Sequence, residues 1–180
     1  MLLLSGRSIL LVVDVQERLA PAISESEKVM DRIAVLLKAA RELDVPALAT
    51  EQYSKGLGST VAPLAALLPP DGVVEKIHFN AALEPGFVER LRGLDRTQIV
   101  VTGTEAHVCV LQTVLGLKAA GFDCFLVADA VGSRDPENRL FGLERMRANG
   151  VEIVTAEMVM FEWLCRAGTP AFKRVLPLIR

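Results

Sequence analysis

Three residues of this sequence carry side chains that could perform nucleophilic chemistry together: Cys109, Asp14 and Lys76. Cys109 lies in the stretch 99–111, IVVTGTEAHVCVL, where a β-branched run gives way to apolar residues at helical spacing. This pattern predicts a buried strand, a polar turn and a helix, with Cys109 in or near the first helical turn. Unpaired N–H groups and the helix dipole favour negative charge there, so we expect a thiol pKa below the free value of about 8.5.

Cys109 also has a simpler interpretation, as a small buried apolar residue at the start of a helix, since free cysteine is among the most buried residue types. Its neighbours favour a functional role. A glycine and several polar residues separate the strand from the helix, and this is where open α/β sheets bind their ligands.

Asp14 and Lys76 each stand at the end of a strand-like run. Asp14 directly follows the apolar residues LLVV, and Lys76 lies in the stretch VVEKIH. Alone, the carboxylate could form a cap or loop hydrogen bond, and the amine could be solvated. If the strands are neighbours, their ends would bring a base, a cation and a thiol to one edge of the sheet.

Strand-like runs and amphipathic helical segments alternate along the whole chain. We expect strands at 8–13, 46–50, 73–77, 99–101, 122–128 and 151–155. We expect helices at 26–43, 61–68, 87–94, 106–119 and 136–148, and a helical C-terminal segment. This alternation predicts an α/β fold with a parallel sheet covered on both faces, in the strand order 3-2-1-4-5-6. No linker or repeat divides the sequence, so we expect a single domain over 1–180.

Composition excludes several classes of function. The 180 residues are 51% hydrophobic and 23% charged, with a net charge of -2 and no basic cluster, so we expect neither a nucleic-acid nor a membrane partner. The apolar N-terminus MLLLSGRSILLVVDV is interrupted by Arg7 and Asp14 and predicts a first strand of a cytoplasmic protein. No glycine-rich phosphate loop follows that strand, which argues against a nucleotide cofactor.

Metal and disulfide chemistry are also not expected. The three cysteines lack CxxC spacing and an even count, and there are only two histidines, His78 and His107. We expect Cys124, in an apolar run, and Cys165, near Trp163, to be core residues.

Three stretches resemble the motifs of the isochorismatase-like cysteine hydrolases in order and spacing: VVDVQ at 12–16, EKIHF at 75–79 and GTEAHVCV at 103–110. The resemblance implies a three-layer α/β/α sandwich with a six-stranded parallel sheet. It also implies a catalytic triad of Asp14, Lys76 and Cys109, a cis peptide bond at Thr104-Glu105, and no cofactor.

The resemblance also implies how these residues would act. Lys76 would hold Cys109 as a thiolate, and Asp14 would take the thiol proton and pass it to the leaving group. The backbone N–H groups of Glu105 and Cys109 would form the oxyanion hole. Attack on an amide-like carbonyl would give a thioester, which water activated by Asp14 would cleave.

Two departures narrow the resemblance. Nicotinamidases of this family carry an Asp-x-His metal motif after strand 2, whereas residues 50–58 here read TEQYSKGLG, so we expect no zinc or iron and no nicotinamide substrate. The EQYxKGLG element resembles the isochorismatase-domain-containing subgroup instead. Isochorismatases proper do not rely on a cysteine nucleophile, so Cys109 points away from isochorismate.

Residues around the triad are candidates to bind a small-molecule substrate, although each could also be structural. They are Gln16, Gln52, Tyr53, His78, Phe79 and His107.

The leading hypothesis is therefore a metal-independent cysteine hydrolase that acts on a small amide-like C–N bond. One alternative is a thiol redox protein that uses Cys109, and another is a binding or scaffold protein that retains the pocket without turnover. The resemblance also implies a homo-oligomer, for which the apolar segment 158–164 is a candidate interface.

Overall fold

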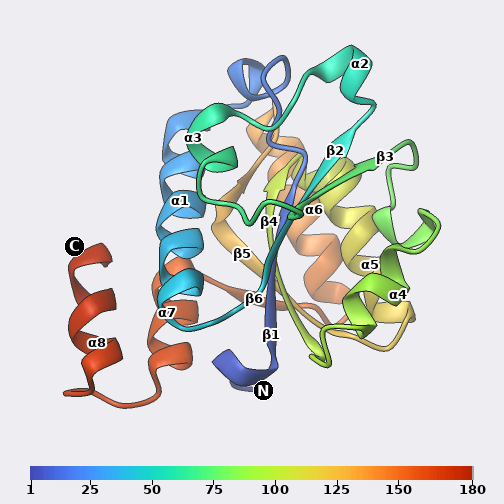
Figure 1. The fold of residues 1–180 in the computed structure, drawn as a ribbon. Helices are drawn as coiled ribbons and strands as arrows, with labels where there is room; N and C mark the ends of the chain where they lie inside the picture. The colour runs from blue at the N-terminus through green and yellow to red at the C-terminus, as the bar shows by residue number, and fades with distance from the viewer. Residues whose placement is uncertain (180) are drawn as a thin grey trace.

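The computed structural model describes residues 1–179 and contains a six-stranded parallel sheet with helices on both faces (Figure 1). The strand order β3-β2-β1-β4-β5-β6 confirms the predicted order and fold class. The strands are β1 (Ser8–Val13), β2 (Ala47–Gln52), β3 (Val73–Lys76), β4 (Gln98–Thr104), β5 (Asp123–Gly132) and β6 (Glu152–Val154).

The helices form the two outer layers of a three-layer sandwich. Helices α1 (Ser26–Glu42), α3 (Ala62–Ala65), α7 (Ala156–Leu164) and α8 (Pro170–Val175) cover one face. Helices α4 (Phe87–Arg92), α5 (Leu111–Ala119) and α6 (Pro136–Ala148) cover the other face, and the short helix α2 (Ser54–Leu57) follows β2 at the edge of the sheet.

The central strand β1 shows why the chain builds two cores. All six of its residues are buried, and successive side chains of a strand point to opposite faces. Leu10 and Val12 pack in the core beneath α1 and α7, whereas Ile9, Leu11 and Val13 pack in the core beneath α5 and α6. A continuous apolar run is therefore needed here, as for other strands buried on both faces.

Several element boundaries differ from those expected from sequence. Strand β2 continues to Gln52 because it pairs with β3, with Gln52 opposite Lys76, and β5 extends to Gly132. The helix expected at 61–68 shrinks to α3. The segment that follows β4 begins as a five-residue π-helix, Ala106–Val110, before α5.

Cys165 was expected in the core, and this prediction is wrong. Helix α7 ends at Leu164, and Cys165 has a positive φ of 57° that turns the chain away from the core and leaves the side chain exposed. Cys124 is buried as predicted.

Candidate active site

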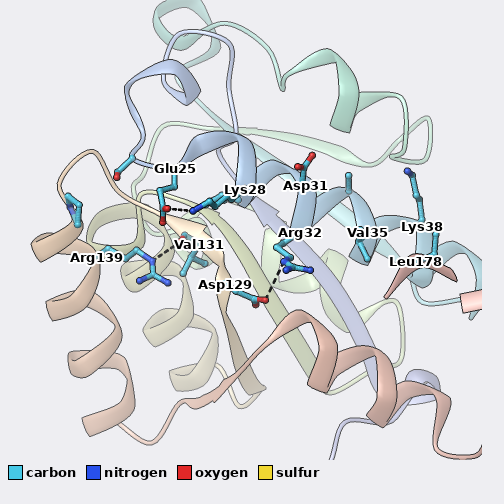
Figure 2. A pocket seen from close by; sticks show the side chains of 14 residues that line it. Glu25, Lys28, Asp31, Arg32, Val35, Lys38, Asp129, Val131, Arg139 and Leu178 are labelled. Atoms are coloured by element: carbon cyan, nitrogen blue, oxygen red, sulfur yellow. Dashed lines mark hydrogen bonds and ion pairs between the residues drawn. The ribbon is translucent and has the colours of Figure 1, made fainter. Parts of the chain in front are cut away.

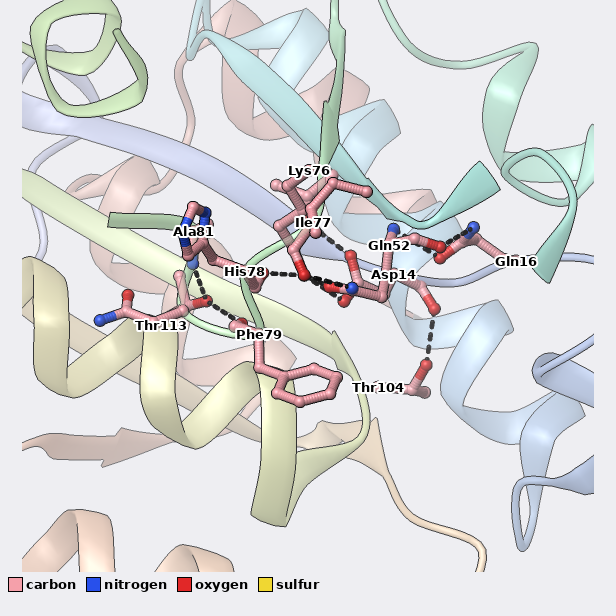
Figure 3. Close-up of polar contacts among 12 residues, drawn as sticks. Asp14, Gln16, Gln52, Lys76, Ile77, His78, Phe79, Ala81, Thr104 and Thr113 are labelled. Atoms are coloured by element: carbon pink, nitrogen blue, oxygen red, sulfur yellow. Dashed lines mark hydrogen bonds and ion pairs between the residues drawn. The ribbon is translucent and has the colours of Figure 1, made fainter. Parts of the chain in front are cut away.

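Asp14 follows β1 at the carboxyl edge of the sheet, where the ends of β1, β2, β3 and β4 meet. Its side chain is fully buried and bonds on both oxygens. Oδ2 accepts from Lys76 Nζ at 2.8 Å (Figure 3), and Oδ1 accepts from Thr50 Oγ1 at 2.7 Å. The Asp14 carbonyl accepts from Thr104 Oγ1 at 2.8 Å. Side chains from β2 and β3 therefore fix the carboxylate of Asp14, and a side chain from β4 fixes its backbone.

The approach of β4 to the end of β1 requires a glycine. Gly103 has a φ of 114°, and a Cβ atom at this position would lie 2.0 Å from the carbonyl oxygen of Val13. Any side chain would separate the two strands, so Gly103 allows Thr104 to reach Asp14.

Lys76 ends β3, and its ammonium group is buried among three acceptors. Nζ donates to Asp14 Oδ2 at 2.8 Å, to Gln52 Oε1 at 2.6 Å and to the carbonyl oxygen of His78 at 3.2 Å (Figure 3). A lysine ammonium has three N–H donors. All three therefore have protein acceptors, and the effect of Lys76 on a nearby thiol is mainly electrostatic.

Cys109 lies in the π-helix Ala106–Val110, and 7% of the residue is exposed. The carbonyl oxygen of Glu105 closes this turn by accepting from Val108 N at 3.0 Å and Val110 N at 3.2 Å. The preceding Thr104-Glu105 peptide bond is cis, at the bond for which the sequence resemblance implied it. Single π turns occur often at functional sites.

The electrostatic environment of Cys109 contradicts the expected lowering of its pKa. Burial, followed by the negative charge of Asp14, raises the pKa of the Cys109 thiol to about 12, against the opposing effect of the Lys76 charge. Because Asp14 neutralises Lys76, the cation alone does not hold a thiolate in the resting site. The thiol is therefore protonated at neutral pH and needs a base.

Asp14 is placed to be that base. Burial raises the pKa of its carboxyl group, whereas Lys76 and the hydrogen bond from Thr50 lower it. The thiol also interacts with the Asp14 side chain. A carboxylate with a raised pKa beside a neutral thiol can accept a proton from it.

Two predicted substrate-binding residues are used structurally. Gln16 Nε2 donates to the carbonyl oxygens of Gln52 at 3.0 Å and Gly58 at 2.7 Å, and Gln16 Oε1 accepts from Gln52 N at 2.8 Å. Gln52 Nε2 donates to Ile77 O at 2.7 Å, and its Oε1 accepts from Lys76. Both amides thus have protein partners, and Gln52 holds the ammonium group of Lys76 in place.

Tyr53 and Phe79 remain at the surface near the site. They are 54% and 53% exposed, and Phe79 extends away from the polar cluster (Figure 3). The Tyr53 backbone N–H donates to the carbonyl oxygen of Lys76 at 2.9 Å, and both side chains remain candidates to contact a substrate.

The two histidines have protein partners. His78 Nδ1 lies 2.9 Å from Glu84 Oε2 at the surface, and His107 Nδ1 lies 3.0 Å from Ser133 Oγ. His107 belongs to the π-helix that carries Cys109, so its side chain also ties this helix to the residue that follows β5.

The family model of the isochorismatase domain matches residues 8–158, which include Asp14, Lys76 and Cys109. The chain belongs to the isochorismatase family. It is 38% identical over 174 residues to isochorismatase domain-containing protein 2 of Danio rerio, an alignment that covers 96% of this chain and 86% of the relative.

Solved structures of related proteins have the same fold. A Caenorhabditis elegans protein described as MAR1 ribonuclease superposes with a TM-score of 0.93 at 33% identity and covers 99% of this chain and 92% of its own. The Escherichia coli YcaC product, described as an octameric hydrolase of unknown specificity, has a TM-score of 0.87 at 24% identity, covering 98% and 92%. The second likeness shows the shared fold alone.

Two features of the described residues 1–179 bear on metal and membrane binding. No group of three or more His, Cys, Asp or Glu side chains in this range could hold a metal ion. No helix in the same range is long and apolar enough to span a membrane. Metal independence stays a prediction.

A groove of about 970 Å³ lies apart from the triad, between α1 and the end of β5 (Figure 2). Its charged side chains pair mainly with the protein itself: Glu25 with Lys28, and Arg32 Nε with Asp129 Oδ2 at 3.7 Å. Arg139 Nε donates to a backbone carbonyl of β5 at 2.9 Å. No residue of the triad lines this groove.

Sequence reasoning missed the residues that support the triad. Thr50 and Thr104 bond to Asp14, and Arg134 Nε donates to Glu105 Oε1 at 3.0 Å. Thr50 and Thr104 could have been found from sequence, because each lies at or near the end of a strand that neighbours the strand before Asp14. Arg134 had no such signal, because its contact depends on how the loop after β5 folds back.

Proposed function

We propose that this protein is a metal-independent cysteine hydrolase that cleaves a small amide-like C–N bond through a thioester on Cys109. The observation that carries the proposal is the buried Asp14–Lys76 ion pair, 2.8 Å long, beside a nearly buried thiol. A salt bridge with a purely structural role has no need of a thiol beside it. Buried ionisable groups with shifted pKa values, such as Asp14 and Cys109, are concentrated in enzyme active sites.

The proposed first step transfers the Cys109 proton to Asp14 as Sγ attacks the substrate carbonyl carbon. The site holds one carboxylate, one ammonium and one neutral thiol before the transfer, and one neutral carboxyl, one ammonium and one thiolate after it. The total charge stays the same, so the buried site gains no uncompensated charge. Lys76, no longer facing a carboxylate, then stabilises the thiolate.

The oxyanion of the tetrahedral intermediate would be bound by the backbone N–H groups of Glu105 and Cys109. The Glu105 N–H has no acceptor among residues 1–179, as this role requires. Collapse breaks the C–N bond, and Asp14 returns the proton to the leaving amine. Asp14 then removes a proton from water, which attacks the thioester and frees the acid and the thiol.

The proposed substrate is small because only 7% of Cys109 is exposed. Tyr53, Phe79 and His107 are the side chains proposed to contact it. Both N–H donors of the Gln16 amide and one of the Gln52 amide have protein acceptors, and the Gln52 oxygen accepts from Lys76, so we assign these two residues to positioning.

A panel of small amides, with an RNA oligonucleotide included because of the name of the nematode relative, tests this proposal. We expect amide turnover by the wild type, an acyl adduct on Cys109 by peptide mass mapping, and neither in Cys109→Ala. Turnover that survives in Cys109→Ala would overturn the proposal. So would redox cycling of a Cys109 sulfenic acid in the absence of hydrolysis.

The remaining predictions concern the setting of the protein. We propose a single domain over 1–180, a cytoplasmic location, a small-molecule partner without nucleic acid or membrane, no cofactor, and a homo-oligomer. Met158 and Phe161 of α7 are 45% and 44% exposed, which supports α7 as an interface. Native mass spectrometry of Met158→Glu against the wild type tests the interface, and an unchanged oligomer would exclude it.

A further inference from the structure

The turn that carries the nucleophile is held from outside by the loop between β5 and α6. Arg134 donates to Glu105 Oε1 twice, through its backbone N–H at 3.2 Å and through Nε at 3.0 Å. Ser133 Oγ meets His107 Nδ1 at 3.0 Å. One short segment therefore contacts two residues of the turn between β4 and α5.

These contacts surround the Glu105 N–H. On one side, the Thr104 hydroxyl is tied to the carbonyl oxygen of Asp14 at 2.8 Å. On the other side, the Glu105 carbonyl closes the π turn through Val108 and Val110. The side chain of Glu105, which is 10% exposed and anchored by Arg134, is the third tether of this residue.

We infer that Arg134 is a positioning residue that acts through the Glu105 carboxylate to orient the Glu105 N–H toward the developing oxyanion. The inference rests on the proposed hydrolase function and goes beyond it, because Arg134 lies outside the triad and the motifs of the sequence. Its side chain is 64% exposed, so the ion pair itself contributes little to stability. Its contribution is to geometry, to which oxyanion stabilisation is sensitive.

Two small reagents separate oxyanion stabilisation from thiol ionisation. p-Nitrophenyl acetate acylates a thiol by attack at a carbonyl carbon, which forms an oxyanion, a thioester and p-nitrophenolate. Methyl methanethiosulfonate forms a mixed disulfide by attack at sulfur and releases methanesulfinate, without a carbonyl oxyanion. A change in the thiol pKa or its access alters both rates, whereas a displaced oxyanion donor alters the first rate only.

The variants are Arg134→Gln, Glu105→Ala and the double variant, with Arg92→Gln as the matched control. Like Arg134, Arg92 is an arginine at the surface. Its Nη2 donates to the backbone carbonyl of Ala120 at 3.2 Å, at the opposite edge of the sheet from Cys109. Rates are corrected with Cys109→Ala, and thermal unfolding checks that each variant is folded.

We expect Arg134→Gln to slow acylation about tenfold, less than the roughly 10²- to 10³-fold loss when an oxyanion donor is removed outright. Its thiosulfonate rate should stay within about twofold of wild type. Glu105→Ala should show the same pattern, and the double variant no further loss, because the arginine acts through the glutamate. Arg92→Gln should leave both rates unchanged.

The inference fails if Arg134→Gln acylates at the wild-type rate, if both reagents slow equally, or if the losses multiply in the double variant. The proposed function fails in a different way: wild-type acylation would then be no faster than that of Cys109→Ala.

Discussion

Replacing Asp14 by Asn should change how the reactivity of Cys109 depends on pH. A thiol that exchanges its proton with solvent at a pKa of about 12 is ionised to about one part in 10⁴ at pH 8. A free thiol of pKa about 8.5 is roughly one quarter ionised at that pH. Without an internal base, Cys109 should therefore react about 2,000-fold more slowly than a model thiol.

With Asp14 as internal base, the proton stays within the site, and the rate of alkylation should be independent of pH near neutrality. The rate should fall in acid as the carboxylate, whose pKa burial raises, takes a proton from solvent. In Asp14→Asn, the proton must leave to solvent, so the rate should rise tenfold per pH unit at neutral pH. Loss of the carboxylate charge should also bring the pKa of the thiol below that of the wild type.

Iodoacetamide alkylation from pH 6 to 10, followed by peptide mass mapping of Cys109, measures both profiles. Asp123→Asn is the control, since this carboxylate lies at the opposite end of β5 from the site and is partly exposed. A wild-type rate that rises tenfold per pH unit, parallel to Asp14→Asn, would refute internal proton transfer.

Three further predictions follow from burial and packing. Lys76→Met leaves the Asp14 carboxylate buried without its cation, so the free energy of unfolding should fall by about 3 to 5 kcal/mol, and less at low pH where the carboxyl is neutral; urea titration measures this. Gly142→Ala places a Cβ 3.1 Å from the backbone of the π turn that carries Cys109, so it should lower the free energy of unfolding by about 1 to 3 kcal/mol and slow acylation of Cys109. Gly6→Ala, with no atom within 4 Å, should lower it by less than about 0.5 kcal/mol. Burial raises the pKa values of the Cys109 and Cys124 thiols to about 12. The free energy of unfolding should therefore stay constant below about pH 8.5 and fall above it by about 1.4 kcal/mol per thiol and per pH unit, because only the unfolded chain ionises there. Cys124→Ala should halve this slope.

Each of these has an outcome that would contradict it. Equal stability of Lys76→Met and wild type at neutral pH would mean that the ion pair is not desolvated. Equal effects of the two glycine substitutions would exclude close packing of α6 on the π turn. An unchanged alkaline slope in Cys124→Ala would mean that other groups control stability there.

The sequence determined the fold because its signals are local and repeated. Short continuous apolar runs such as 9–13 are typical of strands buried on both faces, and their alternation with amphipathic helices favours right-handed parallel crossovers. The same logic placed Asp14, Lys76 and Cys109 at the ends of strands 1, 3 and 4, and hence at one edge of the sheet.

Only the tertiary structure decided what that edge does to its residues. The pKa of Cys109 rises instead of falling because burial and a neutralised lysine outweigh a helix terminus. Gln16 and Gln52 became structural because strand β2 runs two residues farther than its propensity indicates. The contact of Arg134 with Glu105 joins residues 29 positions apart. Desolvation, strand pairing and loop contacts of this kind depend on distances in space between residues that are far apart in the sequence. Residue type and local spacing do not determine those distances.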